Sequence, residues 1–228
     1  MSITYSKLDN PAWFALSETH ADFSISSGKA KRYRAEIVSF AAQESGTVEL
    51  TPDLKSLLGK NDSVFVIGEL PVQSNEFVME TVLPCAQMIS FSPVKIKSLV
   101  TIEQLHEEND GELNTLVNFV QPGYFNKETR LMGDYFGIRQ DGKLVAVTGE
   151  RMRMFGLTEV SAVVTHPDYT GRGFAQQLVA HVVNKNLDSG VIPFLHVSES
   201  NQRAIGIYEM LGFVKRRTIN FTKIIKHK

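Results

Sequence analysis

Two closely spaced glycines mark the segment of this 228-residue chain whose residue types could do chemistry. An apolar, β-branched run ends at Val163-Val164-Thr165, and Gly171 and Gly173 follow directly before an apolar-periodic segment that starts at Phe174. Glycine lets the backbone turn tightly and approach a ligand closely. The first amides of a helix have no partner within the helix and lie at the positive end of its dipole. The strand–turn–helix pattern therefore predicts a pyrophosphate site, to which Arg172 adds positive charge.

Three interpretations of these glycines are open on the residues alone. A Walker A loop requires Lys followed by Ser or Thr after its last glycine, whereas Phe174-Ala175 stand here. A Rossmann fingerprint requires a third small residue and an early βαβ unit, but the strand patterns before this segment indicate antiparallel hairpins. The third interpretation is an ordinary strand-to-helix turn in which glycine only satisfies the backbone geometry.

The elements that would position this segment are clearest after a predicted boundary at Ser92-Pro93. Strands are expected at 96–100, 135–139, 144–151, 158–164, 192–197 and 219–225, and helices within 103–120, near 126, over 174–187 and over 201–211. Asp141-Gly142 between two strand patterns predicts a tight hairpin. Hairpins followed by a β-α-β-α run predict an α+β fold with a mixed, mostly antiparallel central sheet flanked by helices.

The first 91 residues predict a smaller α/β region. Helices should begin at Asn10-Pro11 and at Thr51-Pro52, because a polar N-cap precedes proline at the first helical position in both. Strands are expected at 64–67 and 77–82, whereas 28–40 shows no clear pattern. We therefore predict two units, residues 1–91 and residues 92–228, with the chemistry in the second.

Composition narrows the class of protein. The net charge is −1, with 24 Lys and Arg against 25 Asp and Glu, and lacks the basic excess of nucleic-acid-binding proteins. Cys85 is the single cysteine and cannot form an internal disulfide, which favours a reducing compartment. No apolar run reaches the roughly 20 residues that span a bilayer, and no cluster has metal-ligand spacing. We expect a cytoplasmic protein with no metal, nucleic-acid or membrane partner, and a homodimer stays open.

The glycine segment resembles motif A of the GNAT superfamily of N-acetyltransferases, whose signature is Gln/Arg-x-x-Gly-x-Gly/Ala at a strand–helix junction. Thr170-Gly171-Arg172-Gly173-Phe174-Ala175 fits this signature except at Thr170, where the family has Gln or Arg. That departure removes one side-chain contact and leaves the backbone amides unaffected.

A second segment supports the same resemblance. Asn201, Ala204, Tyr208 and Gly212-Phe213 match the family's Asn-x-x-Ala-x-x-x-Tyr-x-x-x-Gly-Phe pattern. Two separate motifs in the right order are more specific than either alone. The resemblance covers residues 92–228 and implies a GNAT domain there. The arrangement as a whole is loosely similar to the glycine N-acyltransferase branch, in which a degenerate GNAT-like half precedes the active one.

The resemblance implies acetyl-CoA as co-substrate. The cofactor-binding positions that it implies are Val163, Val164, Thr165, Thr170, Gly171, Arg172, Gly173, Phe174, Ala175, Asn201 and Ala204. Backbone groups of Val163 and Thr165 would pair with the pantetheine amides as an added strand does. Asn201 would contact the pantetheine or the pyrophosphate, or cap a helix, and both roles can hold together.

The resemblance also implies two catalytic residues. Glu159 occupies the strand position where many family members place a general base, which amine attack needs because an alkyl ammonium has a pKa of about 10.4. Tyr208 matches the tyrosine near the CoA sulfur that acts as general acid. The alternatives are that Glu159 begins a strand at the solvent rim and that Tyr208 is a half-buried aromatic. His166 and His196 are weaker candidate bases, since a lone histidine near a strand end is more often structural.

The resemblance places the acceptor between 118–128 and 216–221, where Phe119, Tyr124 and Phe125 could line an apolar pocket or simply pack the turn. The expected acceptor is a small-molecule or peptide amine, and an amino acid, a small amine, an antibiotic and a protein N-terminus all fit. Two further functions stay open. One is a CoA-binding sensor or interaction module without catalysis, and the other is transfer of a longer acyl group.

Overall fold

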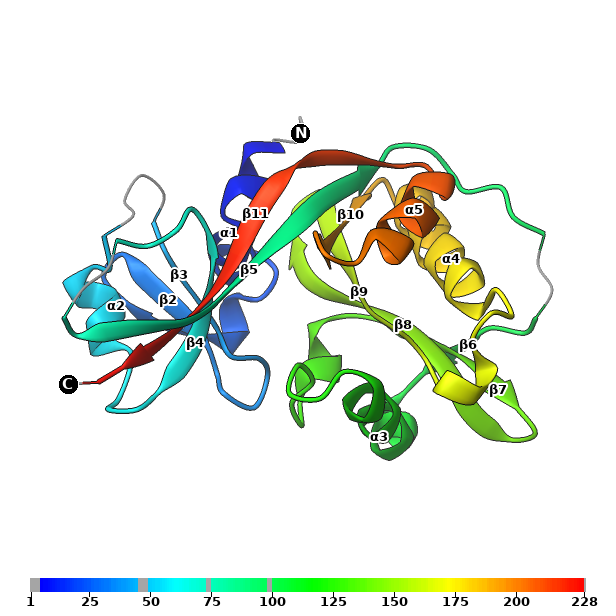
Figure 1. Cartoon of the computed structure of the whole chain (residues 1–228), viewed down its shortest axis with the longest axis horizontal. Coiled ribbons are helices and arrows are strands. Elements are labelled where there is room, and N and C mark those ends of the chain that lie inside the picture. Colours follow the sequence, from blue (N-terminus) through cyan, green and yellow to red (C-terminus); the bar gives the residue numbers. More distant parts are fainter. Residues whose placement is uncertain (1–4, 45–48, 73–74, 98–99, 228) are drawn as a thin grey trace.

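The computed structural model describes residues 5–44, 49–72, 75–97 and 100–227, and these contain one eleven-stranded mixed sheet (Figure 1). The strands follow the order β1-β2-β3-β4-β11-β5-β10-β9-β8-β7-β6. They comprise β1 (Ser24–Ser27), β2 (Ala30–Tyr33), β3 (Phe40–Gln43), β4 (Ser63–Gly68), β5 (Phe77–Ser90), β6 (Glu103–Leu105), β7 (Tyr135–Gln140), β8 (Lys143–Met154), β9 (Leu157–Thr165), β10 (Ile192–Ser198) and β11 (Phe213–Lys226). The α-helices are α1 (Pro11–Ser17), α2 (Pro52–Ser56), α3 (Asp110–Val120), α4 (Phe174–Asp188) and α5 (Gln202–Met210). None of the helices described is long and apolar enough to cross a membrane.

Helices cover both faces of the sheet in the C-terminal part, as expected from the sequence. The side chains of β7 alternate between the two faces, so that Tyr135 packs with Leu116 and Val117 of α3 while Phe136 packs with Leu178 of α4. The predicted α+β fold with helices on a mixed sheet is therefore confirmed. Four of its strands, β6 to β9, are joined in antiparallel pairs, whereas β9 and β10 are parallel.

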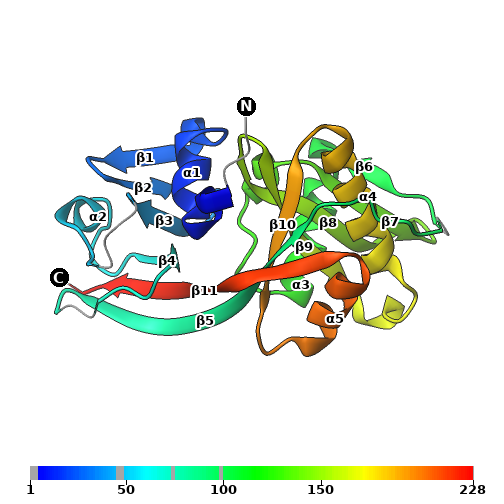
Figure 2. The same ribbon diagram turned by 90° about the horizontal axis from the view of Figure 1, so that it is seen from above.

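Two long strands connect the two ends of the molecule (Figures 1 and 2). β5 and β11 are antiparallel partners from Phe77–Lys226 to Ser90–Phe213. β11 also pairs with β4, and β5 also pairs with β10, so the sheet continues without a break from the N-terminal to the C-terminal part. The division into residues 1–91 and 92–228 stays a prediction, and β5 contributes a strand of the first unit between two strands of the second.

Most predicted element starts agree with the structure. Helices begin at Pro11 and Pro52, and the Thr51 side chain accepts from the Leu54 amide at 3.3 Å as an N-cap. Asp141 and Gly142 both have positive φ, as a tight hairpin between β7 and β8 requires.

Two local predictions are wrong. The described residues of the predicted strand 96–100, which are 96, 97 and 100, are not in a strand, and Ile96 is exposed. The edge of the sheet beside β7 is taken by β6 instead. The predicted helix near 126 is a single 3-10 turn, η4 (Thr129–Met132).

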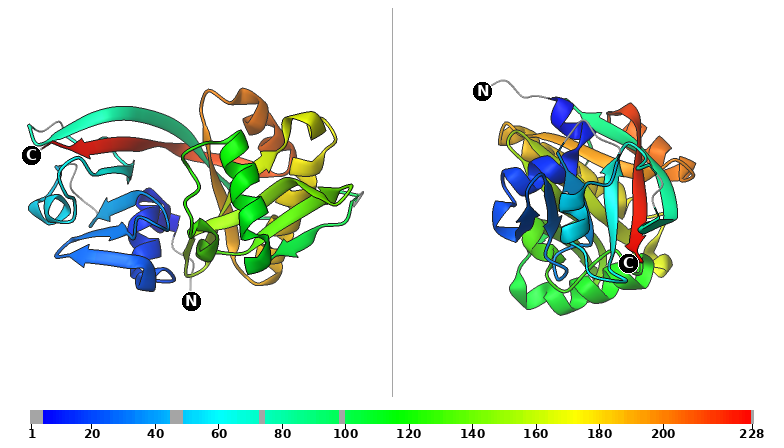
Figure 3. Two further views of the ribbon diagram at one scale, coloured as in Figure 1. Left: turned by 90° about the horizontal axis from the view of Figure 1, so that it is seen from below. Right: turned by 90° about the vertical axis from the view of Figure 1, so that its left-hand side faces the viewer.

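The N-terminal elements lie together at one end of the molecule (Figure 3). Two of their residues form hydrogen bonds with η4. The His20 ring is buried, with Nδ1 3.0 Å from the Tyr33 hydroxyl and Nε2 2.9 Å from the Met132 carbonyl. Because a carbonyl can only accept, Nε2 carries the proton and Nδ1 accepts from Tyr33. Thr129 donates its hydroxyl hydrogen to the Ile37 carbonyl at 2.5 Å. The N-terminal residues thus position the segment that precedes β7.

The buried His20 predicts a loss of stability in mild acid. Burial lowers the pKa of His20 to about 4, against about 6.5 in an unfolded chain, so the unfolded state binds the proton more tightly between these values. The contribution is fully present above about pH 6.5 and is lost as pH falls towards 4. From this group we expect a free energy of unfolding about 2 kcal/mol lower at pH 5 than at pH 7.5.

Urea unfolding at the two pH values tests this expectation. His20→Gln should show a smaller difference between pH 7.5 and pH 5 than the parent, and His227→Gln, at an exposed histidine, should show the parental difference. Equal differences in the parent and His20→Gln would rule out His20 as the source of the pH dependence.

Candidate active site

The parallel strands β9 and β10 separate after a short paired stretch. Their register pairs Leu157–Glu159 with Ile192–Phe194 and stops there. Ala162 has a φ of 50°, in the left-handed region, and the register of β9 against β8 shifts across it. A bulge of this kind bends a strand and re-aims its backbone. Beyond Glu159, β9 therefore leaves β10 and exposes the backbone edge that would otherwise pair with it.

The glycine turn lies at the end of β9 and begins α4, as the sequence predicts. Gly171 and Gly173 have φ values of 76° and 77°, which explains the need for glycine at both positions. Gly173 is the N-cap of α4, and its carbonyl accepts from the Gln177 amide at 3.1 Å. No residue in the described ranges accepts from the amides of 174–176. These amides point to an anion site at the positive end of the helix.

A cavity of about 390 Å³ opens where the two strands diverge. Its lining includes Val163, Asn201, Ala204 and Tyr208, all of which the sequence assigned to the cofactor or to catalysis. The lining also includes the aromatic residues Phe40 of β3, Phe65 of β4 and Phe221 of β11. The volume lies within the range of small-molecule sites. Strands from both ends of the chain thus build one cavity.

Tyr208 presents its hydroxyl group to this cavity. The side chain is buried on α5, and its ring packs edge-on against Phe213 at 5.9 Å between centroids. No hydrogen-bond partner for the hydroxyl occurs among the described residues. Burial raises the pKa of Tyr208 to about 12, so the hydroxyl stays protonated at neutral pH. It is therefore available as a hydrogen-bond donor.

Glu159 is fully buried and is held by two side chains. Arg151 donates from Nε to Oε2 at 2.8 Å and from Nη2 to Oε1 at 2.6 Å, and His196 Nδ1 lies 2.7 Å from Oε1. Burial alone would raise the pKa of Glu159, but the charge and hydrogen bonds of Arg151, with the hydrogen bond of His196, lower it to about 2. A carboxylate with so low a pKa has little affinity for a proton. These contacts favour an electrostatic role for Glu159 over direct proton abstraction, and its general-base role stays a prediction.

The hydrogen bonds of His196 determine its tautomer. The Gln87 amide nitrogen donates to the Leu8 carbonyl at 2.8 Å and lies 2.9 Å from His196 Nε2, while the Gln87 oxygen accepts from Arg216 at 2.9 Å. Gln87 is therefore a donor to Nε2, which leaves the ring proton on Nδ1, facing Glu159. His196 has no free lone pair for the base role that the sequence left open.

The remaining predicted cofactor residues lie around the start of α4 and along β9. Val164 and the Phe174 side chain are buried in the core, so only their backbone groups could reach a ligand. The Thr170 hydroxyl donates to the Pro167 carbonyl at 3.0 Å, and the Arg172 guanidinium lies 4.9 Å from the Tyr169 ring centroid. Asn201 caps α5 by accepting from the Ala204 amide at 3.1 Å, which is the helix-capping role that the sequence left open.

Two of the three aromatic residues predicted for the acceptor pocket line the cavity. Tyr124 and Phe125 belong to its wall. Phe119 does not, because its ring is exposed and stacks on His166 at 5.3 Å between centroids. The sequence did not identify Arg151, Phe40 or Phe65 as site residues.

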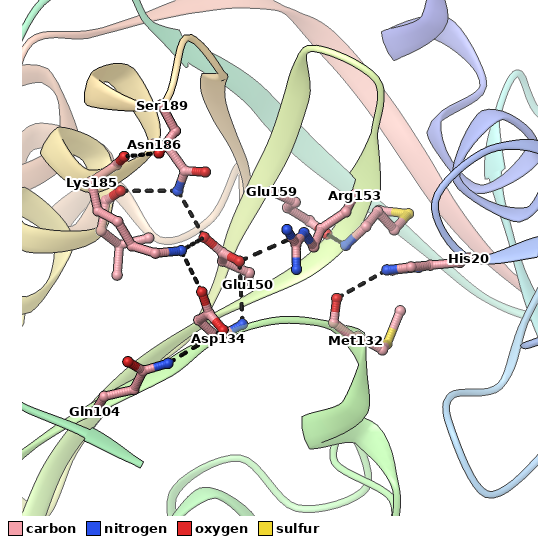
Figure 4. Close-up of polar contacts among 12 residues, drawn as sticks. His20, Gln104, Met132, Asp134, Glu150, Arg153, Glu159, Lys185, Asn186 and Ser189 are labelled. Atoms are coloured by element: carbon pink, nitrogen blue, oxygen red, sulfur yellow. Dashed lines mark hydrogen bonds and ion pairs between the residues drawn. The ribbon is translucent and has the colours of Figure 1, made fainter. Parts of the chain in front are cut away.

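A second buried carboxylate anchors the other end of α4 (Figure 4). Glu150 of β8 accepts from Lys185 at 3.0 Å, from the Asn186 side chain at 2.9 Å and from the Asp134 amide at 3.2 Å. Lys185 also forms an ion pair with Asp134. These bonds fix α4 to the sheet at its C-terminal end and so help to hold its N-terminal turn beside β9. No group of three or more potential metal ligands occurs within the described ranges.

Comparisons with known proteins identify the family. The FR47-like protein family matches residues 135–222. A crystal structure of a protein from Novosphingobium aromaticivorans, described as an acetyltransferase from the GNAT family, is 34% identical with a TM-score of 0.88, and the match covers 97% of this chain and 99% of that one. The fold is that of the GNAT acetyltransferases. The chain belongs to the GNAT family.

More distant matches share the fold or a part of the sequence. A GCN5-related N-acetyltransferase from Kribbella flavida has the same fold, with 14% identity, a TM-score of 0.63 and coverage of 95% of this chain and 96% of that one. An acetyltransferase from Yersinia pestis is 42% identical over 60 residues, which are 25% of this chain and 42% of that protein. The chain thus matches less than half the length of this curated relative.

Proposed function

We propose that the protein transfers an acetyl group from acetyl-CoA to a primary amine by direct attack in a ternary complex. The observation that carries this proposal is the divergence of β9 and β10 beside the unpaired amides of α4. The exposed edge of β9 suits the pantetheine arm, and the helix N-terminus suits the pyrophosphate. The cavity at the point of divergence would receive the amine.

In this proposal the amine nitrogen forms a bond to the acetyl carbon as the carbon–sulfur bond breaks. The Tyr208 hydroxyl donates a hydrogen bond to the sulfur as negative charge develops there. None of the described lining residues is Asp or Glu, so the amine proton would pass to water rather than to a carboxylate of the wall. Glu159 would not contact the substrates, and its hydrogen bonds would hold the side chains of Arg151 and His196 in position.

We expect selective binding of CoA, because the N-terminus of α4 and the open edge of β9 are the features on which the proposal depends. Isothermal titration calorimetry with CoA and with NAD tests this expectation. CoA and acetyl-CoA should release measurable heat, and NAD should not. Absence of CoA binding at high micromolar ligand, or a preference for NAD, would contradict the cofactor assignment.

A panel of acyl-CoA thioesters and amines, followed by free thiol release, tests the activity itself. Turnover with acetyl-CoA would support acetyl transfer, and a preference for longer thioesters would support the alternative with a longer acyl group. CoA binding without turnover of any amine would favour the sensor alternative. The presence of Tyr208 with its free hydroxyl at the cavity supports the enzyme, because a protein that only binds CoA has no need of a donor there.

A further inference from the structure

Arg151 carries the only full positive or negative charge among the described residues that line the cavity. Its side chain comes from β8 and is 14% exposed. A second cationic group on the acceptor would meet no carboxylate in the described wall, whereas an anionic group would meet a guanidinium. The charge of the wall therefore disfavours polyamines and favours an acceptor that carries a negative group.

The guanidinium has hydrogen-bond donors left for such a group. It has five N–H bonds, and Glu159 accepts from only Nε and Nη2. Nη1 has no acceptor within the described ranges. The guanidinium carbon of Arg151 lies 5.0 Å from the Phe40 ring centroid and 5.7 Å from that of Phe221, so these two rings pack against the guanidinium. The remaining donors lie in the guanidinium plane at the edge away from Glu159.

We infer that Arg151 binds a carboxylate of the acceptor, which is a primary amine with an apolar body, as in an amino acid with an apolar side chain. The inference rests on the proposed function, because it takes the cavity as the acceptor site. A planar fork of N–H donors matches a carboxylate better than a point charge does. The rings of Phe40, Phe65 and Phe221 provide the apolar contacts for the rest of the molecule.

Glu159 makes this arrangement compatible with an empty cavity. An unpaired guanidinium among aromatic rings would be costly, and pairing with the Glu159 carboxylate offsets part of that cost. Glu159 lies on the neighbouring strand, and the same two bonds hold the guanidinium in one orientation. The alternative is that the pair only stabilises the fold, in which case the acceptor's charge would not matter.

Matched acceptors separate the two alternatives. We expect leucine or phenylalanine to be acetylated with a kcat/KM at least about 10-fold higher than leucinamide or phenylalaninamide, because a hydrogen bond to a charged group contributes that much or more. Thiol release with acetyl-CoA measures both members of each pair. Equal or better turnover of the amides, or turnover only of amines without a carboxylate, would overturn the inference.

Arg151→Gln/Glu159→Gln removes both charges and leaves no buried ion unpaired. We expect this variant to bind CoA as the parent does and to lose the preference for the acid over the amide. The control is Arg139→Gln/Glu112→Gln, an ion pair outside the cavity, which should keep the parental preference. If the double variant does not fold, Arg151→Lys retains the charge and loses the fork, and its preference should fall below that of the parent. If the measured variant keeps the parental preference for the acid over the amide, Arg151 does not bind the carboxylate of the acceptor.

Binding of the product distinguishes failure of this inference from failure of the proposed function. N-acetylleucine should bind to the CoA-saturated parent at least about 10-fold more tightly than N-acetylleucinamide. The two ligands should bind to the double variant with equal affinity. If no amine is turned over but this preference is found, the enzyme proposal fails and the carboxylate site stands. If amines are turned over and N-acetylleucine shows no preference, the carboxylate site is wrong and the enzyme proposal stands.

Discussion

Gly173→Val should reduce the affinity for CoA about 10²-fold while the protein stays folded. Gly173 has a φ of 77° at the N-cap of α4, a conformation that a β-branched residue adopts only with strain. The valine would either turn the first amides of α4 away from a pyrophosphate or place its methyl groups where the phosphates approach. A hydrogen bond to a charged group contributes about 1.5–3 kcal/mol, so losing one or two accounts for the expected change.

Gly190→Val provides the matched control for this variant. Gly190 follows the other end of α4 with a φ of 72°, and a side chain there would meet no atom within 4 Å. Only the Gln176 side chain, at 3.9 Å, lies near the position that a side chain at Gly173 would take. Both variants should lose a similar amount of stability, and only Gly173→Val should lose CoA affinity by calorimetry. Parental CoA affinity in a folded Gly173→Val would show that this turn is not the pyrophosphate site.

The elements of the C-terminal part could be predicted because their signals are local. The hairpin at Asp141-Gly142, the glycines before α4 and the cap of α5 depend on residues adjacent in sequence. The predicted strand 96–100 failed because an apolar run does not specify a partner. Pairing at the edge of the sheet selected the less apolar segment 103–105 instead.

The aromatic residues of the cavity could not be predicted because they come together only through the sheet. Phe40 and Phe65 lie more than 80 residues before Arg151 in sequence, and the register of β4 with β11 brings Phe65 opposite Lys223, two residues from Phe221. One signal was available for Arg151. A hairpin around Gly156 places Arg153 opposite Thr158, and therefore Arg151 near Glu159, which would have marked an ion pair beside the predicted base.

The role of Glu159 shows what a motif leaves out. The family resemblance gives the strand position of a base, but the protonation behaviour of the carboxylate depends on its neighbours. Arg151 and His196 occupy both of its oxygens and hold its pKa near 2. The His196 tautomer in turn depends on Gln87 of β5, which precedes the predicted boundary at Ser92-Pro93. Residues before that boundary thus contribute to the electrostatics of the candidate site.

Tyr208→Phe should reduce turnover at least about 10²-fold, the lower end of the range for general acid–base groups. The pKa of Tyr208 is about 12 and that of a thiol is about 8.5, so complete proton transfer to a free thiolate is unfavourable. The hydroxyl would act by donating a hydrogen bond to the sulfur as the carbon–sulfur bond breaks. That contribution exists mainly in the transition state, so it should appear in kcat and not in CoA affinity. Stability should hardly change, because the hydroxyl has no partner to lose among the described residues.

Thiol release at saturating acetyl-CoA, with an acceptor from the amine panel, measures this effect in the parent and the variant. Calorimetry with CoA and a urea unfolding curve establish that the variant is folded and binds its cofactor. Tyr5→Phe is the matched control, since Tyr5 is 39% exposed, lies outside the cavity wall and packs against Phe91. Because the phenylalanine keeps the ring against Phe213, a drop in kcat alone would isolate the hydroxyl hydrogen. An unchanged kcat would remove Tyr208 from the chemistry and leave it as a packing residue of α5.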